Sequence, residues 1–196
     1  MNKNLLMDIE FIVELDKMKT ILRQTSIIDN PRREDDAQHS WHISLMAMIL
    51  SEYSNYKIDL CKTIKMLLIH DLVELHAGDT FCYDKEANRG KRAREEEAIG
   101  KIARSLSGSK GEEIKKLWTE FEDMETEEAI FGAAMDRLQP MLNNYYNDGG
   151  TWKKFDVPKE DIYKRISPVE EASDDLWGFV KHMIEDAHEQ GLISKQ

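Results

Sequence analysis

Hydrophobic side chains recur at helical spacing along most of the chain. In residues 5–22 they stand three and four positions apart, which predicts a helix whose buried face is formed by Leu5, Ile9, Ile12, Leu15, Met18 and Leu22. Residues 23–37 interrupt the pattern with Asn30-Pro31 and the mixed charges RREDD, so we expect a loop there. A second helix is predicted from about residue 38, with Ile43, Met46, Ala47 and Leu50 facing inward.

The remaining segments also follow a helical rather than an alternating pattern. A deeply buried helix is expected over residues 59–75, an exposed one over 91–106, an amphipathic one over 112–121 and a long one over 126–147. We find no alternating strands, internal repeat or long linker. The sequence therefore predicts an all-α, single-domain helical bundle over residues 1–196, with a core at about 23–150 and C-terminal helices at 158–190 packing on it.

Composition narrows the class of protein. The 196 residues suit one domain with a real core. The formal net charge of −11 disfavours nucleic acid as a partner, because such binding depends on Lys and Arg neutralising phosphates. A small phosphate ester stays possible, since a bound cation sets the local field. Acidic residues within the N-terminal apolar stretch argue against a membrane segment. Cys61 and Cys82 form no CxxC pair, which suggests reduced thiols in a cytoplasmic protein.

Ionisable side chains interrupt the most hydrophobic run of the protein, residues 66–75. Burying His70, Asp71 and Glu74 without partners would cost several kcal/mol. They are therefore either hydrogen-bonded within the core or bound to a cation. On a continuous helix His70 and Glu74 share a face, whereas Asp71 is rotated by roughly 100° and lies at its edge.

Two further segments bear on this choice. His39 opens one helix, and Asp136 interrupts the small-residue run of another. Each has an ordinary interpretation alone, an exposed first turn for His39 and an intrahelical ion pair or a solvated position for Asp136. Together, His39, His70, Asp71 and Asp136 offer two imidazoles and two carboxylates from three helices. That set suits one divalent cation, with histidines favouring Zn, Fe, Co or Ni and carboxylates admitting Mn or Mg.

The same ligand set would support hydrolysis of a phosphate ester. Four protein ligands on an octahedral ion leave two positions, one for a water molecule and one for a phosphate oxygen. The ion lowers the pKa of the water and polarises phosphorus, and a nearby carboxylate accepts the proton.

The order of these residues resembles the H…HD…D signature of the HD-domain phosphohydrolases. Three blocks carry the resemblance, which extends over about residues 5–190 and is strongest to the single-domain 5′-deoxynucleotidase branch: DAQHSWHISLMAMIL, HDLVELHAGDTF and DRLQPMLNNY. It implies a helical bundle around one divalent ion. Dinuclear members carry extra histidines between the HD pair and the last aspartate, and here none lies between His76 and Asp136.

The resemblance also implies roles for individual residues. Glu74 corresponds to the general base or water-positioning group, Asp79 assists it, and Arg23 contacts phosphate. Arg137 and Trp41 are further candidates for substrate binding, and core packing is the alternative for Trp41.

The function expected from these features is hydrolysis of (deoxy)ribonucleoside 5′-monophosphates to nucleoside and phosphate through a metal-activated water. The alternatives are a non-catalytic HD protein that binds a nucleotide or metal, and a purely structural helical protein. A homodimer is a further hypothesis, suggested by related proteins and by the aromatic residues Trp118, Phe121, Trp152 and Trp177.

Overall fold

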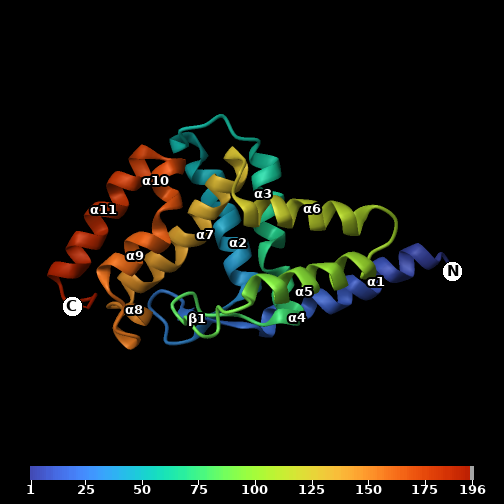
Figure 1. Cartoon of the computed structure of the whole chain (residues 1–196), viewed down its shortest axis with the longest axis horizontal. Coiled ribbons are helices and arrows are strands. Elements are labelled where there is room, and N and C mark those ends of the chain that lie inside the picture. The colour runs from blue at the N-terminus through green and yellow to red at the C-terminus, as the bar shows by residue number, and fades with distance from the viewer. Residues whose placement is uncertain (195–196) are drawn as a thin grey trace.

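The structure is a computed structural model that describes residues 1–194, so the last two positions of the predicted domain lie outside the described residues. Helices surround one small antiparallel sheet (Figure 1). The elements in chain order are α1 (Lys3–Leu15), η1 (Asp16–Thr20), β1 (Leu22–Ser26), β2 (Arg33–Asp35), α2 (Asp36–Leu50), η2 (Ser51–Tyr53), α3 (Leu60–Ile69), η3 (His70–Val73), α4 (Glu74–Ala77), α5 (Lys91–Ser105), α6 (Lys110–Asp123), α7 (Glu127–Tyr146), α8 (Gly150–Lys154), α9 (Lys159–Ile166), α10 (Pro168–Ala172) and α11 (Asp174–Glu189), where η marks a 3₁₀ turn.

The helices predicted over 91–106, 112–121 and 126–147 are confirmed as α5, α6 and α7. Thr126 begins α7 by accepting a hydrogen bond from the Ala129 N–H. The helix then continues through Pro140, which has no N–H to donate. The carbonyl of Asp136, four residues earlier, therefore loses its helical donor, and the backbone is locally less constrained at a candidate metal ligand.

The loop predicted over residues 23–37 contains a hairpin instead. Strands β1 and β2 pair antiparallel, with Leu22 opposite Asp35. The Arg33 side chain donates to the carbonyls of Leu22 and Arg23. Asp35 caps α2 by accepting from the Gln38 N–H, while the Gln38 side chain accepts from the Asp35 N–H. The charges that suggested a loop thus hold the hairpin and begin the next helix.

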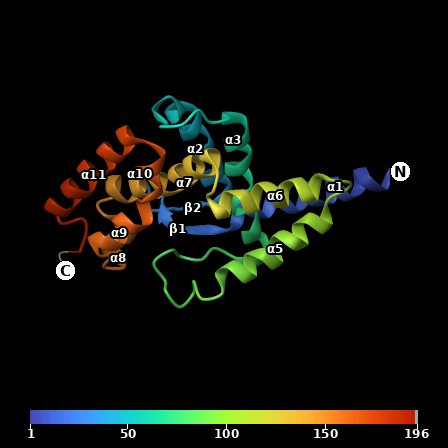
Figure 2. The ribbon, with the colours of Figure 1, turned by 45° about the horizontal axis from the view of Figure 1, so that its top comes forward.

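Apolar side chains form two cores, and η3 belongs to the smaller one. The larger lies among α2, α3, α7 and the C-terminal helices and includes Ile43, Met66, Phe131, Met135 and Val180. The smaller joins α1, η1, η3, α5 and α6 through Phe11, Met18, Ile99, Ile102 and Trp118. Figure 2 shows α1, α5 and α6 extending together away from the bundle. The site described below lies where the two cores meet.

The helix predicted over 59–75 is divided at this junction. Helix α3 ends at Ile69, and His70 begins the 3₁₀ turn η3. A 3₁₀ turn has three residues per turn, so the side-chain directions differ from those of the continuous helix expected from sequence. The Trp118 Nε1–H donates to the His70 carbonyl at 3.2 Å and ties η3 to α6. As a result His70 and Asp71 both point into the site.

Three expectations about surface and core are wrong. In α1 the inward residues include Phe11, whereas Leu5, Ile9 and Ile12 of the expected buried face are 55%, 47% and 58% exposed. Trp41 is 62% exposed, which contradicts core packing. The aromatic residues Trp118, Phe121 and Trp152, taken as surplus surface, are instead buried.

Candidate metal centre

Three buried side chains from different elements form a candidate metal site. His39 comes from α2, His70 from η3 and Asp136 from α7, and their ligand atoms all lie within 4.8 Å of one another. His39 Nε2 is 3.0 Å from Asp136 Oδ1, and His70 Nε2 is 3.6 Å from the same oxygen. Residues as much as 97 positions apart in sequence thus meet at one point, as their types predicted.

Asp71, the fourth predicted ligand, lies beside these three. Its Oδ2 is 3.1 Å from His70 Nε2 and 4.0 Å from His39 Nε2. The same oxygen accepts a hydrogen bond from Arg23 Nη1 at 2.6 Å. Asp71 therefore faces both the imidazoles and Arg23, and a cation bound to the histidines would share this carboxylate with the guanidinium.

Hydrogen bonds on the far side of each imidazole orient its Nε2 toward the site. His39 Nδ1 bonds to Gln139 Oε1 at 3.0 Å, and His70 Nδ1 bonds to the Leu67 carbonyl at 2.9 Å. Because both partners are acceptors, the neutral form of each ring, which is the form that binds a metal, carries its proton on Nδ1. Each Nε2 lone pair then faces carboxylate oxygens, and buried His70 Nε2 has no hydrogen-bond partner. Lone pairs directed at carboxylates fit a cation placed between them.

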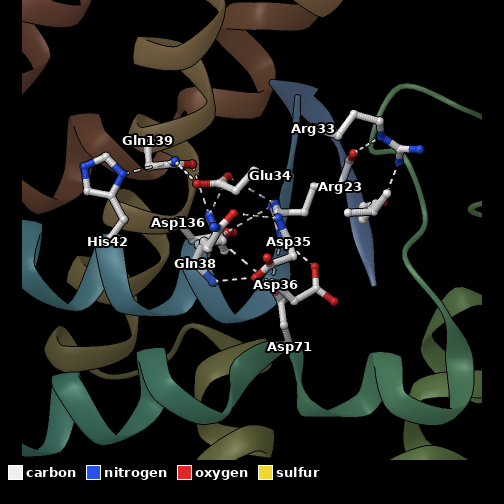
Figure 3. Close-up of polar contacts among 12 residues, drawn as sticks. Arg23, Arg33, Glu34, Asp35, Asp36, Gln38, His42, Asp71, Asp136 and Gln139 are labelled. Carbon is white, nitrogen blue, oxygen red and sulfur yellow. Dashed lines mark hydrogen bonds and ion pairs between the residues drawn. The ribbon is translucent and has the colours of Figure 1, made fainter. Parts of the chain in front are cut away.

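The charges around Arg23 reinforce this conclusion. Its guanidinium lies within 4.0 Å of carboxylate oxygens from Glu34, Asp36, Asp71 and Asp136 (Figure 3). Burial alone would lower the pKa of Arg23, but Asp71, Asp136, Glu74 and Asp36 raise it instead. Asp71 and Asp136 have lowered pKa values and are ionised, while burial raises the pKa of Glu34 and of Asp36 to about 7. Together these acids carry more negative charge than one guanidinium balances, and a divalent ion would balance the remainder.

The two histidines respond differently to these surroundings. Burial, followed by repulsion from Arg23, lowers the pKa of His39 to about 4, so the ring is neutral at physiological pH and can act as a ligand. Burial would lower the pKa of His70 too, but Asp71 and Asp136 raise it to about 10. The shift shows that positive charge is strongly favoured at this position, whether a proton or a metal ion supplies it.

Three more acids border the ligands. Burial, followed by repulsion from Asp71, raises the pKa of Asp36 to about 7 and raises that of Glu74 well above its usual range. Burial also raises the pKa of Asp79. Glu74 is the first residue of α4, directly after η3, and Glu74 and Asp79 both line the cavity described below. The predicted base and its assistant are thus placed together beside Asp71.

Sequence reasoning missed the support for His39. The buried Gln139 accepts from the imidazole and donates through Nε2 to Glu34 Oε1 at 2.8 Å, and the same nitrogen is 3.3 Å from His42 Nδ1. The only sign in the sequence that Gln139 belongs to the site is its position one helical turn after Asp136. Glu34 lies on β2, within the segment expected to be a loop.

A cavity of about 160 Å³ opens onto the ligands. Its wall includes the predicted residues Arg23, His70, Asp71, Glu74, Asp79, Asp136 and Arg137. Trp41 is not among the lining residues and points to solvent instead. Arg165, which the sequence did not single out, also lines the cavity, and its Nη2 is 3.5 Å from Asp136 Oδ2. Burial, followed by repulsion from Arg165, lowers the pKa of Arg137 to about 10, so the Arg137 guanidinium remains charged at neutral pH.

Comparison with known proteins gives one family. A family model described as HD domain matches residues 15–177. The structure is similar to that of a predicted metal-dependent phosphohydrolase from Magnetospirillum magnetotacticum, with a TM-score of 0.92, 40% identity and coverage of 97% of this chain and 96% of that one.

Curated relatives agree with this match. The chain is 34% identical over 145 residues to 5′-deoxynucleotidase HDDC2 of Dictyostelium discoideum, covering 70% of this chain and 75% of that protein. It is 28% identical to the human protein of the same name, covering 68% of this chain and 65% of the human one. Among residues 1–194, no helix has the length and apolar character needed to cross a membrane.

Proposed function

We propose that this chain, which belongs to the HD-domain family and is a metal-dependent hydrolase, releases phosphate from (deoxy)ribonucleoside 5′-monophosphates. The observation that carries the proposal is the convergence of His39, His70, Asp71 and Asp136, of which the last three line a cavity that Glu74 also lines. The curated relatives named 5′-deoxynucleotidase support a nucleotide as the substrate.

The four converging side chains would hold the divalent ion. A divalent ion in such a site supplies Lewis acidity and activates water for attack on phosphorus. The neutral imidazole of His39 and the two aspartates suit several ions, so Mn, Co, Fe, Zn, Ni and Mg are all candidates. Because the sequence has no histidine between His76 and Asp136, we propose a single ion.

Glu74 would accept the proton from the attacking water, and Asp79 would help to hold that water. A carboxylate with a raised pKa is a stronger base, and a cation beside it lowers that pKa toward neutrality. Arg23, whose guanidinium lies beside Asp71, would contact the phosphate group that is released, and Arg137, also on the cavity wall, would contact the rest of the substrate. We do not assign Trp41 to the substrate, because its side chain lies outside the cavity lining.

The test is a phosphate-release assay on the purified protein, stripped with chelator and reloaded with Mn, Co, Fe or Mg. The panel contains nucleoside and deoxynucleoside 5′-monophosphates and, for contrast, nucleoside 3′-monophosphates. We expect release from the 5′-esters only. Glu74→Gln should retain the metal and lose about 10²–10⁴-fold in turnover, whereas Glu112→Gln, a change at an exposed position of α6, should have no effect. Binding of metal and nucleotide without release would favour a regulatory protein instead.

We further propose that the protein is a homodimer of the cytoplasm. The apolar residues Leu5, Ile9, Ile12 and Val13 of α1 are exposed, which suits a face covered by a second copy. Cys61 and Cys82 are free thiols, as a reducing compartment favours. Sedimentation should give a dimer for the native chain and a monomer for Ile12→Glu, and a native monomer would contradict this proposal.

A further inference from the structure

The surface beside the metal centre is basic, although the chain as a whole carries a net charge of −11. A hollow of about 410 Å³ adjoins the inner cavity and shares part of its wall, including Arg137 and Arg165. Lys85 and Lys164 also line it, and its single acidic residue is Asp161. We call this region the outer hollow. Its excess of positive charge makes it a place where an anion would bind.

Arg137 and Arg165 are poorly neutralised by the protein itself. Arg137 donates to Met124 Sδ at 3.2 Å, and within the described part of the chain no carboxylate oxygen forms an ion pair with it. Arg165 reaches one acid, Asp136, at 3.5 Å through an oxygen of the candidate metal ligand. By contrast, Arg92 on the surface of α5 pairs with three acids.

Keeping two guanidinium groups together without matching acids is costly, because like charges repel and partial burial removes water from them. An anion that joins them would reduce this cost. Arginine pairs suit phosphate in particular, since each planar guanidinium can donate two parallel hydrogen bonds to its oxygens.

The available space indicates which part of a substrate this anion belongs to. The inner cavity, at about 160 Å³, is below the ~300 Å³ at which small-molecule pockets begin, so it can hold a phosphate group at the metal but not a whole nucleotide. Two hollows adjoin the inner cavity, one sharing Gln24, Asn144 and Thr151 with it and the other, the outer hollow, sharing a longer wall that includes Arg137 and Arg165. The shared wall favours the outer hollow for the part of the substrate that leaves.

We propose that the preferred substrate is a phosphomonoester whose released alcohol carries a second phosphate group, bound in the outer hollow by Arg137 and Arg165. A nucleoside 3′,5′-bisphosphate, cleaved at the 5′ position, has this chemistry. The inference rests on the proposed function for the reaction, and adds that the site recognises a second anionic group on the part of the substrate that is not cleaved.

The experiment compares 2′-deoxyadenosine 3′,5′-bisphosphate with 2′-deoxyadenosine 5′-monophosphate. Calorimetry on Mn²⁺-loaded Glu74→Gln protein gives the two dissociation constants without turnover, and chromatography of products from the native enzyme gives the two kcat/KM values. We expect the bisphosphate to bind about ten- to hundredfold more tightly, the effect of charge-assisted hydrogen bonds to phosphate, with the gain in kcat/KM mainly in KM.

Substitutions then locate the source of the preference. Arg137→Gln and Arg165→Gln, each combined with Glu74→Gln for calorimetry, should reduce the ratio of the two affinities to near one. Lys115→Gln, a charge change at an exposed position of α6, should preserve it. A native ratio below about threefold, or a ratio that survives both arginine substitutions, would overturn the inference.

The outcomes also separate this inference from the proposed function. If both arginine variants weaken the two ligands equally, the arginines contact only the cleaved phosphate, and the inference fails while nucleotide hydrolysis stands. If the native enzyme releases phosphate from neither compound but calorimetry still gives the preference for the bisphosphate, the proposed reaction fails and the second phosphate site stands.

Discussion

Replacing Gln139 with leucine should weaken metal binding although this side chain cannot itself reach the metal. Gln139 is fully buried, and its Oε1 accepts from His39 Nδ1 at 3.0 Å. This bond places the ring proton on Nδ1 and leaves Nε2 to act as the ligand. In Gln139→Leu the proton loses its acceptor, the ring can rotate or change tautomer, and the buried Glu34 loses the 2.8 Å bond from Gln139 Nε2.

The magnitude follows from these two bonds. Loss of a group that orients a metal-binding histidine typically reduces metal affinity about 10–100-fold, which is ~1.4–2.8 kcal/mol. Burial raises the pKa of Glu34 to about 7, and loss of the bond leaves a buried acceptor unsatisfied, which adds about 1–3 kcal/mol to the cost in folding stability. Gln139→Glu keeps an acceptor for His39 and should retain metal affinity within a few-fold, even though its charge is unfavourable beside Glu34.

The assay is competition for Mn²⁺ against a chromophoric chelator, with thermal unfolding measured in parallel. Asn143→Leu is the matched control, because Asn143 lies one turn further along α7, is buried, and its Nδ2 has no hydrogen-bond partner. We expect this control to leave metal affinity unchanged. If Gln139→Leu binds Mn²⁺ as tightly as the native protein, the argument that Gln139 fixes the tautomer of His39 is refuted.

Three other measurements test the structure more broadly. Mn²⁺ at about 100 times its dissociation constant should stabilise the fold by ~2.7 kcal/mol and raise Tm by about 5–11 °C, and chelation should reverse both effects. An unchanged Tm would contradict the claim that the folded state binds the metal. Gly111→Ala should destabilise the fold by several kcal/mol in denaturant titrations, because the new Cβ would lie 2.0 Å from the Ala103 carbonyl oxygen. Gly178→Ala in α11 meets open space and should stabilise the fold by about 0.5–1 kcal/mol. Equal effects of the two substitutions would show that α5 and α6 do not approach as described. The Lys110 ammonium and the Ser107 N–H lower the pKa of Asp8. The ionised carboxylate therefore stabilises the fold above its ordinary pKa, and this contribution is lost as the pH falls through the lower pKa of the folded state. The difference in stability between native protein and Asp8→Asn should shrink below about pH 4, and a difference that grows there would contradict this reasoning.

The parts of the fold that sequence predicted well are those where local pattern and tertiary burial agree. Helices α5, α6 and α7 have charged outer faces and apolar inner faces, so periodicity alone locates them. The hairpin was missed because its stabilising contacts are made by charged side chains such as Arg33, which sequence patterns assign to loops. The exposed face of α1 was misread because periodicity shows that a face is apolar and does not show what covers it.

The candidate site divides in the same way. His39, His70, Asp71 and Asp136 could be proposed from sequence, because ionisable residues inside apolar helices need partners and only each other could serve. Gln139 and Arg165 could not be identified, since an amide or an arginine on an amphipathic helix is chemically ordinary. Their significance depends on contacts with His39, 100 positions away, and with Asp136, 29 positions away, which exist only in the folded chain.

The position of Arg23 suggests how metal and substrate binding are coupled. Its guanidinium and a cation bound to the histidines must use the same carboxylates, since Arg23 Nη1 lies 2.6 Å from Asp71 Oδ2 and Nη2 lies 4.0 Å from Asp136 Oδ1. When a cation shares these oxygens, the attraction between them and Arg23 weakens, and the guanidinium gains capacity to donate to an anion in the cavity. Metal binding should therefore increase the affinity for phosphate in two ways, through the charge of the ion and through the release of Arg23. By reciprocity, phosphate should increase the affinity for the metal by the same factor.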